Sequence, residues 1–319
     1  MALDLSLSLA AGSLAVDSWT AEAVEALRDG GVDVILLKGP VIAEWLYDRG
    51  ESRPYADADL LVSVSRRPRC ERLLTELGYA LRDPEGEELL TVSGPHAQTW
   101  QRADGATIDL HHSLPGEVYV EGLVWPTLWE RRDHMELAGV EVPVLDIPSR
   151  ALMVALHVFH HGREHRGPME DLRRALARAP DEVWTEGAVV AEDILALPQF
   201  AAGVRMLPEG EALADRLGLP RSDVLEQLEG HSLAAGFERL AGARGGRARV
   251  KLLWREAFPP RSFITWWRPW ARRSPVHLAL GYLYRMGWLA GHVGSGFRAW
   301  RQAHDAGPMD STPQKRYGS

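Results

Sequence analysis

The chain has 319 residues, enough for one large domain or two of ordinary size. Charged residues make up 25% and hydrophobic residues 45%, which excludes a wholly disordered chain, a collagen-like chain and a disulfide scaffold. The 36 basic and 44 acidic side chains give a formal net charge of −8, so we do not expect nucleic acid as a partner. Cys70 is the single cysteine, which excludes an intrachain disulfide and is typical of the reducing cytoplasm.

Neither apolar stretch of the chain fits export or membrane insertion. Residues 1–15 lack the basic region of a signal peptide. Residues 276–290 form a run shorter than the roughly 18 apolar residues of a membrane span, and Arg285 lies near its middle. We therefore expect a cytoplasmic protein without a membrane span.

The first half alternates helical and extended patterns. Asp17 and Ser18 are suited to cap a helix that Gly30-Gly31 would end. The pair Asp104-Gly105 supplies the positive φ angles of a tight hairpin turn. The remaining expected elements are a buried strand over 32–37, a helix over 41–47, a strand over 55–62, a helix over 68–77, a hairpin over 96–112 and a short strand over 140–145.

After residue 147 the pattern changes to helical segments separated by proline and glycine, the first beginning at Pro148-Ser149. We therefore predict an α+β protein with a mixed-sheet domain over 1–147 and a mainly helical domain over 148–305. The polar segment 306–319 is expected to be a disordered tail.

Acidic residues recur at every second position of the strand expected over 55–62. Side chains alternate along a strand, so Asp57 and Asp59 lie on the face opposite Ala58 and Leu60. Two carboxylates side by side repel each other, and a divalent cation such as Mg²⁺ would remove that repulsion. An isolated Asp-x-Asp is more often an ordinary solvated strand end, so this motif alone decides nothing.

A third carboxylate follows the expected hairpin. Asp109 and His111 share one face of the strand, which the hairpin could return beside Asp57 and Asp59. Three carboxylates on neighbouring strands can hold two metal ions, the arrangement that clamps a phosphoryl displacement. His111 either supports the metal ligands or is an exposed strand histidine.

Upstream, a strand leads through Lys38-Gly39-Pro40 directly into a helix. Free backbone N–H groups at such a junction bind anions, and Gly39 lets a phosphate approach closely. Arg53, four residues before Asp57, could reach a triphosphate. The alternatives are an ordinary strand-to-helix turn and a solvated loop arginine.

These motifs occur in an order that resembles the nucleotidyltransferase-like family of the DNA polymerase β superfamily. The segments that carry the resemblance are 36–40 (LLKGP), 53–62 (RPYADADLLV), 77–79 (LGY), 108–111 (IDLH), 156–162 (LHVFHHG) and 170–172 (EDL). The superfamily carries Gly-Ser where this chain has Gly39-Pro40, so a serine contact to phosphate is missing, and Lys38 could substitute for it.

The resemblance implies that Asp57 and Asp59 bind two Mg²⁺ ions, with Mn²⁺ as a possible substitute. Asp109 would bind one of them and help activate the acceptor. The implied reaction moves a nucleoside monophosphate from an NTP such as ATP to a hydroxyl or phosphate oxygen and releases pyrophosphate. Members of this broad family accompany natural-product and peptide-tailoring gene clusters, so the acceptor could be a small molecule, a peptide or a protein.

A histidine-rich helix is expected from Ser149, with an apolar stripe at residues 152, 156 and 159. His157, His160 and His161 lie on its opposite side. They could face the acceptor cleft, bind a transition metal or lie in solvent, and we favour the cleft. The tryptophans between residues 266 and 288 could bind an acceptor, a partner or a membrane surface, but core packing is the simpler interpretation.

Three functions compete on these grounds. The first is the Mg²⁺-dependent nucleotidyltransferase, including a toxin-type transferase acting on protein or RNA. The second is a non-catalytic binding protein on the same fold, against which the three acidic residues argue, since such a protein has no need of them. The third is a metal-dependent phosphohydrolase using the histidine helix, which lacks a His-Asp dipeptide.

Overall fold

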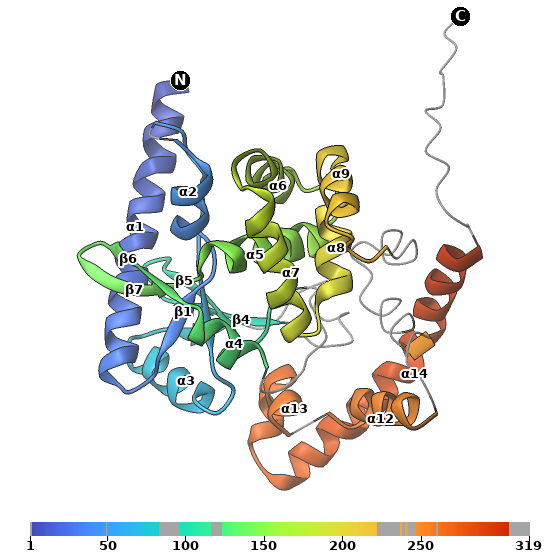
Figure 1. Ribbon diagram of the computed structural model, residues 1–319. Helices are drawn as coiled ribbons and strands as arrows, with labels where there is room; N and C mark the ends of the chain where they lie inside the picture. Colours follow the sequence, from blue (N-terminus) through green and yellow to red (C-terminus); the bar gives the residue numbers. More distant parts are fainter. Residues whose placement is uncertain are drawn as a thin grey trace, which may run out of the picture. The chain divides into compact units, whose positions relative to one another are not determined.

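The computed structural model describes residues 2–48, 50–82, 96–115, 123–221, 237, 240–241, 246–259 and 261–305 (Figure 1). It comprises two compact units, Met1–Pro220 and Arg221–Ser319, each described by itself below. The tail expected over 306–319 lies outside the described residues.

The first unit is built on a mixed seven-stranded sheet of order β3-β4-β5-β2-β1-β7-β6 (Figure 1). Its strands are β1 (Val34–Leu36), β2 (Ala58–Val62), β3 (Ala80–Leu81), β4 (Ala97–Gln101), β5 (Thr107–His111), β6 (Asp133–Leu137) and β7 (Val140–Val144). Strand β2, at the centre, is antiparallel to β1 and parallel to β5. The expected hairpin is formed by β4 and β5, and it returns the chain so that β5 lies beside β2.

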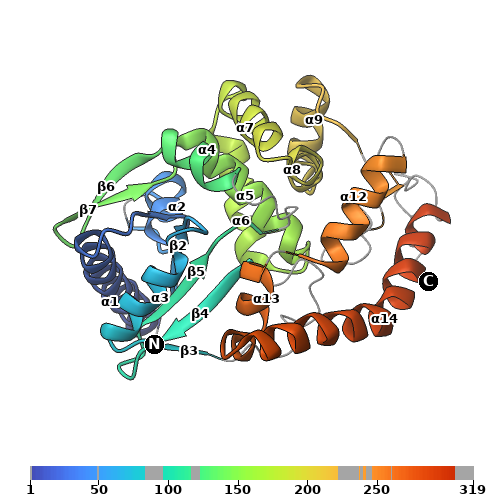
Figure 2. The same cartoon turned by 90° about the horizontal axis from the view of Figure 1, so that it is seen from below.

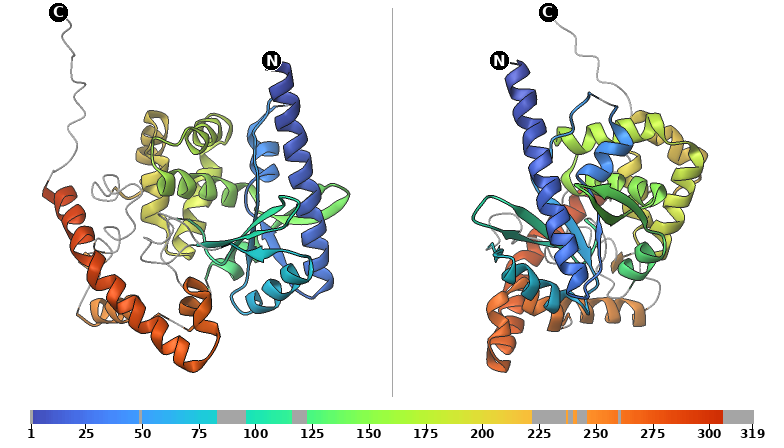
Figure 3. Two further views of the ribbon diagram at one scale, coloured as in Figure 1. Left: turned by 180° about the vertical axis from the view of Figure 1, so that it is seen from behind. Right: turned by 90° about the vertical axis from the view of Figure 1, so that its left-hand side faces the viewer.

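Two helices cover one face of this sheet, α1 (Ala2–Asp29) and α3 (Arg67–Glu76). The apolar side chains of that face, among them Leu60 and Ile108, form one buried core with residues of both helices. Figures 2 and 3 show the sheet between these helices and the later helices of the unit. Because side chains alternate, Asp59 and Asp109 lie on the face away from α1 and α3.

The unit has seven other described helices. They are α2 (Pro40–Leu46), α4 (Val124–Glu130), α5 (Ile147–His161), α6 (Arg166–Arg178), α7 (Asp181–Asp193), α8 (Leu197–Val204) and α9 (Pro208–Arg216). The short helices α2 and α4 lie between strands of the sheet, and α5 to α9 follow its last strand along the chain. Asp146 caps α5 by accepting a hydrogen bond from the Ser149 backbone N–H at 3.0 Å. Helix α5 packs against α6, α7 and α8. At Gly203 the approach is so close that a Cβ would lie 2.0 Å from the Ala155 carbonyl oxygen.

Local boundaries differ from the predictions at three places. Helix α1 begins at Ala2 rather than at Asp17, because the residues before Asp17 are rich in Leu and Ala, which favour helix, and contain no proline; the single Gly12 is tolerated. Asp17 instead accepts a hydrogen bond from the Tyr55 hydroxyl at 2.7 Å. Strand β2 begins at Ala58, so Asp57 lies just before it. In the hairpin, only Gly105 of the expected turn pair has a positive φ, 95°.

The predicted α+β class is confirmed. The sheet ends at Val144, and among the described residues only helices follow from Ile147. Helices α5 to α9 belong to the same compact unit as the sheet, and the domain boundary expected at residue 147 stays a prediction. Strands β3 and β6 were not anticipated, since β3 has two residues and β6 carries charged residues along its exposed positions.

The second unit contains α12 (Gly246–Ala257), α13 (Arg261–Trp267), a 3-10 helix over Pro269–Arg272 and α14 (Pro275–Asp305). Trp267 is 1% exposed, and its ring contacts those of Tyr284 and Trp288. The guanidinium groups of Arg268 and Arg285 lie over the same ring. Trp267 therefore forms part of this unit's core. Within the described residues, no helix is both long and apolar enough to cross a bilayer.

Candidate active site

Carboxylates gather where β2 and β5 lie side by side. Asp59 and Asp109 are direct register partners in this parallel pair. One ligand atom each from Asp59, Asp109 and His111 lie within 4.8 Å of one another. Asp57, just before β2, is close enough that the charges of Asp59 and Asp109 both act on it. The structure thus brings together all three carboxylates that the sequence proposed.

The negative charge of Asp59 is compensated by two neighbouring side chains. Its Oδ1 accepts hydrogen bonds from Lys38 Nζ at 2.7 Å and from His111 Nε2 at 2.9 Å. Burial by itself would raise the pKa of this carboxyl, but the charge of Lys38 and the bond from His111 outweigh it and hold the pKa below its ordinary value. Asp59 is therefore an anion at neutral pH, with its Oδ2 free of donors among the described residues.

Asp57 is in the opposite situation. No described residue donates a hydrogen bond to its partly buried carboxylate. Burial and then the negative charges of Asp59 and Asp109 raise its pKa from 3.8 to about 6. Such an arrangement is costly for the protein alone, and a bound cation would relieve it.

Asp109 is oriented by the neighbouring strand. Thr99 of β4 lies opposite it in register and donates a hydrogen bond from Oγ1 to Asp109 Oδ1 at 2.7 Å. The second oxygen, Oδ2, has no donor within the described part of the chain. Asp109 therefore presents one oriented oxygen to the same space as Asp59.

His111 is 1% exposed, so its interpretation as an exposed strand histidine is wrong. Its ring lies 5.2 Å from that of His96, measured between centroids, and His96 lies 4.8 Å from His160. A continuous row of imidazoles thus joins the carboxylates to helix α5. The histidine face of α5 is turned toward the sheet rather than away from it.

The row continues along α5. The ring of His161 lies 5.0 Å from that of His160 and 4.6 Å from that of His157. Burial, the neighbouring imidazole of His161 and the charge of Lys38 lower the pKa of His160 to about 4, so its ring is neutral at pH 7. In the described parts of the chain, the three-ligand groups are limited to Asp59, Asp109 and His111, so the structure gives no support to a separate metal site on α5.

The strand-to-helix junction has the conformation that its glycine allows. Gly39 has φ 67° and precedes Pro40 at the start of α2. An added Cβ at Gly39 would contact the Tyr55 ring at 3.5 Å, but the positive φ alone disfavours any other residue. Lys38, directly before it, is 15% exposed and directed at Asp59 rather than at solvent.

Arg53 is neither solvated nor unpaired. Its Nε and Nη2 contact both oxygens of Asp171 in α6, at 2.7 to 3.1 Å. Burial disfavours the charged guanidinium, but the bonds and charge of Asp171 outweigh it and raise the pKa of Arg53. The charge of Asp59 also acts on it, which places Arg53 near the carboxylates.

Sequence reasoning missed three functional candidates: Thr99, His96 and Asp171. Thr99 could have been found by extending the register of the expected hairpin from its turn to Asp109. Asp171 belongs to a segment that resembles the family, but nothing in the sequence links it to Arg53, 118 residues away. His96, likewise, is brought to His160 only by the packing of α5.

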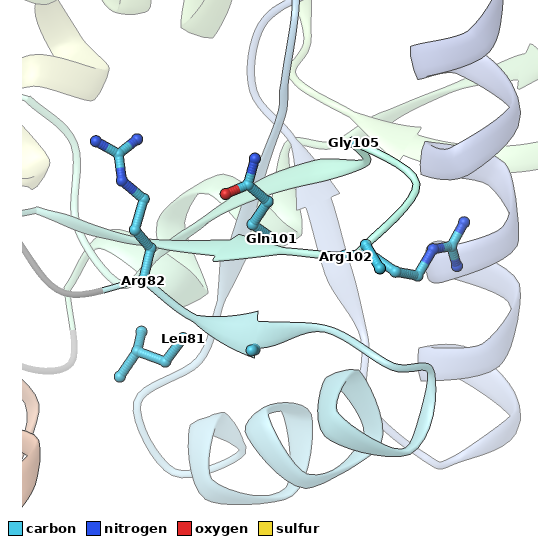
Figure 4. Close-up of a pocket in the computed structure, with 7 residues that line it drawn as sticks. Leu81, Arg82, Gln101, Arg102 and Gly105 are labelled. Atoms are coloured by element: carbon cyan, nitrogen blue, oxygen red, sulfur yellow. The ribbon is translucent and has the colours of Figure 1, made fainter.

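An open pocket of about 430 Å³ lies at the β3–β4 edge of the sheet (Figure 4). Arg82 and Gln101 point to one side there, and Leu81 to the other. The register places Gln101 opposite Thr107, on the sheet face of Asp109. None of the residues proposed for metal or nucleotide lines this pocket.

Comparison with known proteins gives a family and several distant structures. A family model described as "uncharacterised nucleotidyltransferase" matches residues 8–194, more than half of the chain. No curated protein matches. The antibiotic-resistance factor ANT(2'')-Ia is 15% identical, with a TM-score of 0.40 over 57% of this chain and 94% of its own. A nucleotidyltransferase-like protein from Paracoccidioides brasiliensis is 12% identical, with a TM-score of 0.39 over 63% and 92%.

A third similar structure, the lincosamide antibiotic adenylyltransferase LnuA, is 11% identical with a TM-score of 0.33 over 49% of this chain and 92% of its own. The family match spans the sheet, the carboxylates and the histidine helix α5. The chain belongs to this nucleotidyltransferase family, which makes it an enzyme that transfers nucleoside monophosphates.

Proposed function

We propose that the protein is a Mg²⁺-dependent nucleotidyltransferase that moves a nucleoside monophosphate from an NTP to an oxygen of a small-molecule or peptide acceptor, as in natural-product tailoring. The observation that carries the proposal is the carboxylate cluster: Asp57 and Asp109 beside the buried Asp59. Lys38 and His111 compensate Asp59, whereas Asp57 has no donor among the described residues. Three acids held so close are explained by a ligand cation.

The donor set fits the metal. Carboxylate oxygens are the ligands that Mg²⁺ prefers, and the donor-free Oδ2 atoms of Asp59 and Asp109 are available beside Asp57. Asp57 and Asp59 would hold two ions, and Asp109 would share one. Bound Mg²⁺ neutralises charge on the triphosphate and on the leaving pyrophosphate. His111 keeps Asp59 oriented and anionic.

The chain's own cations would bind the triphosphate. Lys38 and Arg53 lie within electrostatic reach of Asp59 and would face the β- and γ-phosphates. Gly39 would give the phosphates backbone access at the start of α2. With the β- and γ-phosphates bound there, the α-phosphorus would lie beside the carboxylates, where the transfer would occur.

The acceptor would lie between the carboxylates and α5. His160 and His161 would line its position, with His157 beside them, since the row of imidazoles runs there from His111. The acceptor oxygen forms a bond to the α-phosphorus while the bond to the bridging oxygen breaks and pyrophosphate leaves. Asp109 would help to take up the acceptor's proton.

Transfer of a nucleoside monophosphate to an acceptor tests this function. Purified protein, ATP and Mg²⁺ are incubated with a panel of hydroxyl-bearing antibiotics, sugar phosphates and peptides, and products are read by mass spectrometry. We expect one acceptor class to gain the mass of a nucleoside monophosphate with wild type and none with Asp59→Asn. Equal product from wild type and Asp59→Asn would refute the carboxylate mechanism.

A further inference from the structure

A buried ion pair, Arg53 with Asp171, joins the loop before β2 to helix α6. Its burial and its number of hydrogen bonds are greater than the attachment of a loop requires. Asp171 is 3% exposed, and its carboxylate accepts four hydrogen bonds, three from Arg53 and one from Tyr47. Arg53 contacts it through Nε and Nη2, and the Tyr47 hydroxyl donates to Oδ1 at 2.8 Å. Burying such a pair costs desolvation that apolar packing would avoid, so stability does not explain it.

Two other ion pairs already join the same loop to α6. Glu51 pairs with Arg174 at 2.6 Å, and Asp48 pairs with Arg178 at 2.7 Å. Both lie at the surface, where ion pairs hold segments together without strict geometry. The loop is therefore tethered without Asp171, and the buried pair has another purpose.

That purpose follows from the geometry of the guanidinium. Arg53 approaches Asp171 side-on, through the edge formed by Nε and Nη2. The remaining nitrogen, Nη1, lies on the opposite edge and has no hydrogen-bond partner among the described residues. Arg53 also acts electrostatically on His157 and is acted on by Asp59. The guanidinium group of Arg53 is thus held in the neighbourhood of the carboxylates, with one edge free of partners among the described residues.

We propose that Asp171, supported by Tyr47, is a positioning residue that fixes Arg53 so that its free guanidinium edge binds the triphosphate of the incoming NTP. This inference rests on the proposed function, because it assumes that an NTP binds beside Asp59. It adds that α6, beyond the sheet, takes part in recognising the β- and γ-phosphates.

Equilibrium binding of a non-hydrolysable ATP analogue and of AMP, each with Mg²⁺, tests the proposal. We expect Asp171→Asn to weaken binding of the ATP analogue about tenfold, the effect of misplacing one charge-assisted contact. AMP affinity should stay within about twofold, since AMP lacks the phosphates concerned. Tyr47→Phe, which removes one of the four hydrogen bonds to Asp171, should show a smaller loss of the same kind.

Two further variants keep the test independent of folding. Arg53→Gln/Asp171→Asn leaves no buried unpaired charge, and it should bind the ATP analogue as Arg53→Gln does, without additional loss. Glu51→Gln breaks a surface pair between the same loop and helix, and it should bind the analogue as wild type does.

The outcomes separate the two levels of the argument. If Arg53→Gln selectively weakens binding of the ATP analogue while Asp171→Asn does not, Asp171 is not a positioning residue. The inference is then wrong, but the proposed function is unaffected. If Asp171→Asn and Glu51→Gln weaken ATP analogue and AMP equally, the pair is only a tether. If Arg53→Gln itself leaves the analogue's affinity unchanged, the phosphate role of Arg53 in the proposed function fails as well.

Discussion

Replacing Asp57 by asparagine should stabilise the protein when metal is absent. In the folded state burial and the charges of Asp59 and Asp109 raise the pKa of Asp57 from 3.8 to about 6. A raised carboxyl pKa is a cost of folding that is fully present above pH 6 and vanishes below the unfolded pKa. The rise corresponds to about 3 kcal/mol at pH 8 and to about 1 kcal/mol at pH 4.5.

Asparagine removes the charge but still buries a polar group, so the net gain in the free energy of unfolding should be about 1–3 kcal/mol at pH 8. Urea unfolding in the presence of a chelator, at pH 8 and at pH 4.5, measures the gain at both ends. Asp33→Asn, which removes an exposed carboxylate, controls for the loss of one negative charge. The same Asp57→Asn variant should lose turnover with Mg²⁺.

The neighbouring carboxylate should respond with the opposite sign. The pKa of Asp59 is lowered by Lys38 and His111, so Asp59→Asn should destabilise the protein, leaving Lys38 without its buried partner. Two results for Asp57→Asn would refute the electrostatic account of the site. One is an equal gain in the free energy of unfolding at pH 8 and at pH 4.5, and the other is a loss of stability at pH 8.

Three further predictions concern binding and turnover. Lys38→Ala should weaken NTP binding several-fold more than NMP binding, measured by calorimetry, and equal losses would exclude Lys38 as a triphosphate ligand. His160→Asn with His161→Asn should raise the acceptor KM or lower kcat while NTP affinity stays within about twofold; a parallel loss of NTP affinity would place these residues in the nucleotide site instead. Thr99→Val should lower kcat several-fold through the lost bond to Asp109, and unchanged steady-state rates would show that Asp109 needs no such support.

Much of the site could be predicted because strand periodicity is local. Alternation placed Asp57 and Asp59 together, and the turn before β5 brought Asp109 beside them. Helical periodicity likewise separated His157 and His160 from the apolar residues of α5. These inferences need only a few neighbouring residues and one hairpin.

What could not be predicted depends on contacts between distant segments. Arg53 was expected to be solvated or to face phosphate, but α6 supplies Asp171 as its partner. The burial of His111 could not be predicted, because it depends on contacts with Asp59 of β2 and with His96, which are distant in the sequence. The start of α1 at Ala2 was not predicted, because Asp17 is a residue type that often caps helices. In the structure Asp17 lies within the helix and accepts a hydrogen bond from Tyr55.

The most direct test of the central claim is calorimetric titration of a non-hydrolysable NTP into wild type, Asp59→Asn and Asp109→Asn, with Mg²⁺ and with chelator. The account predicts binding to wild type that requires Mg²⁺ and is lost or weakened at least tenfold in both variants. Binding of equal strength in chelator, or in variants that have lost these carboxylates, would contradict it.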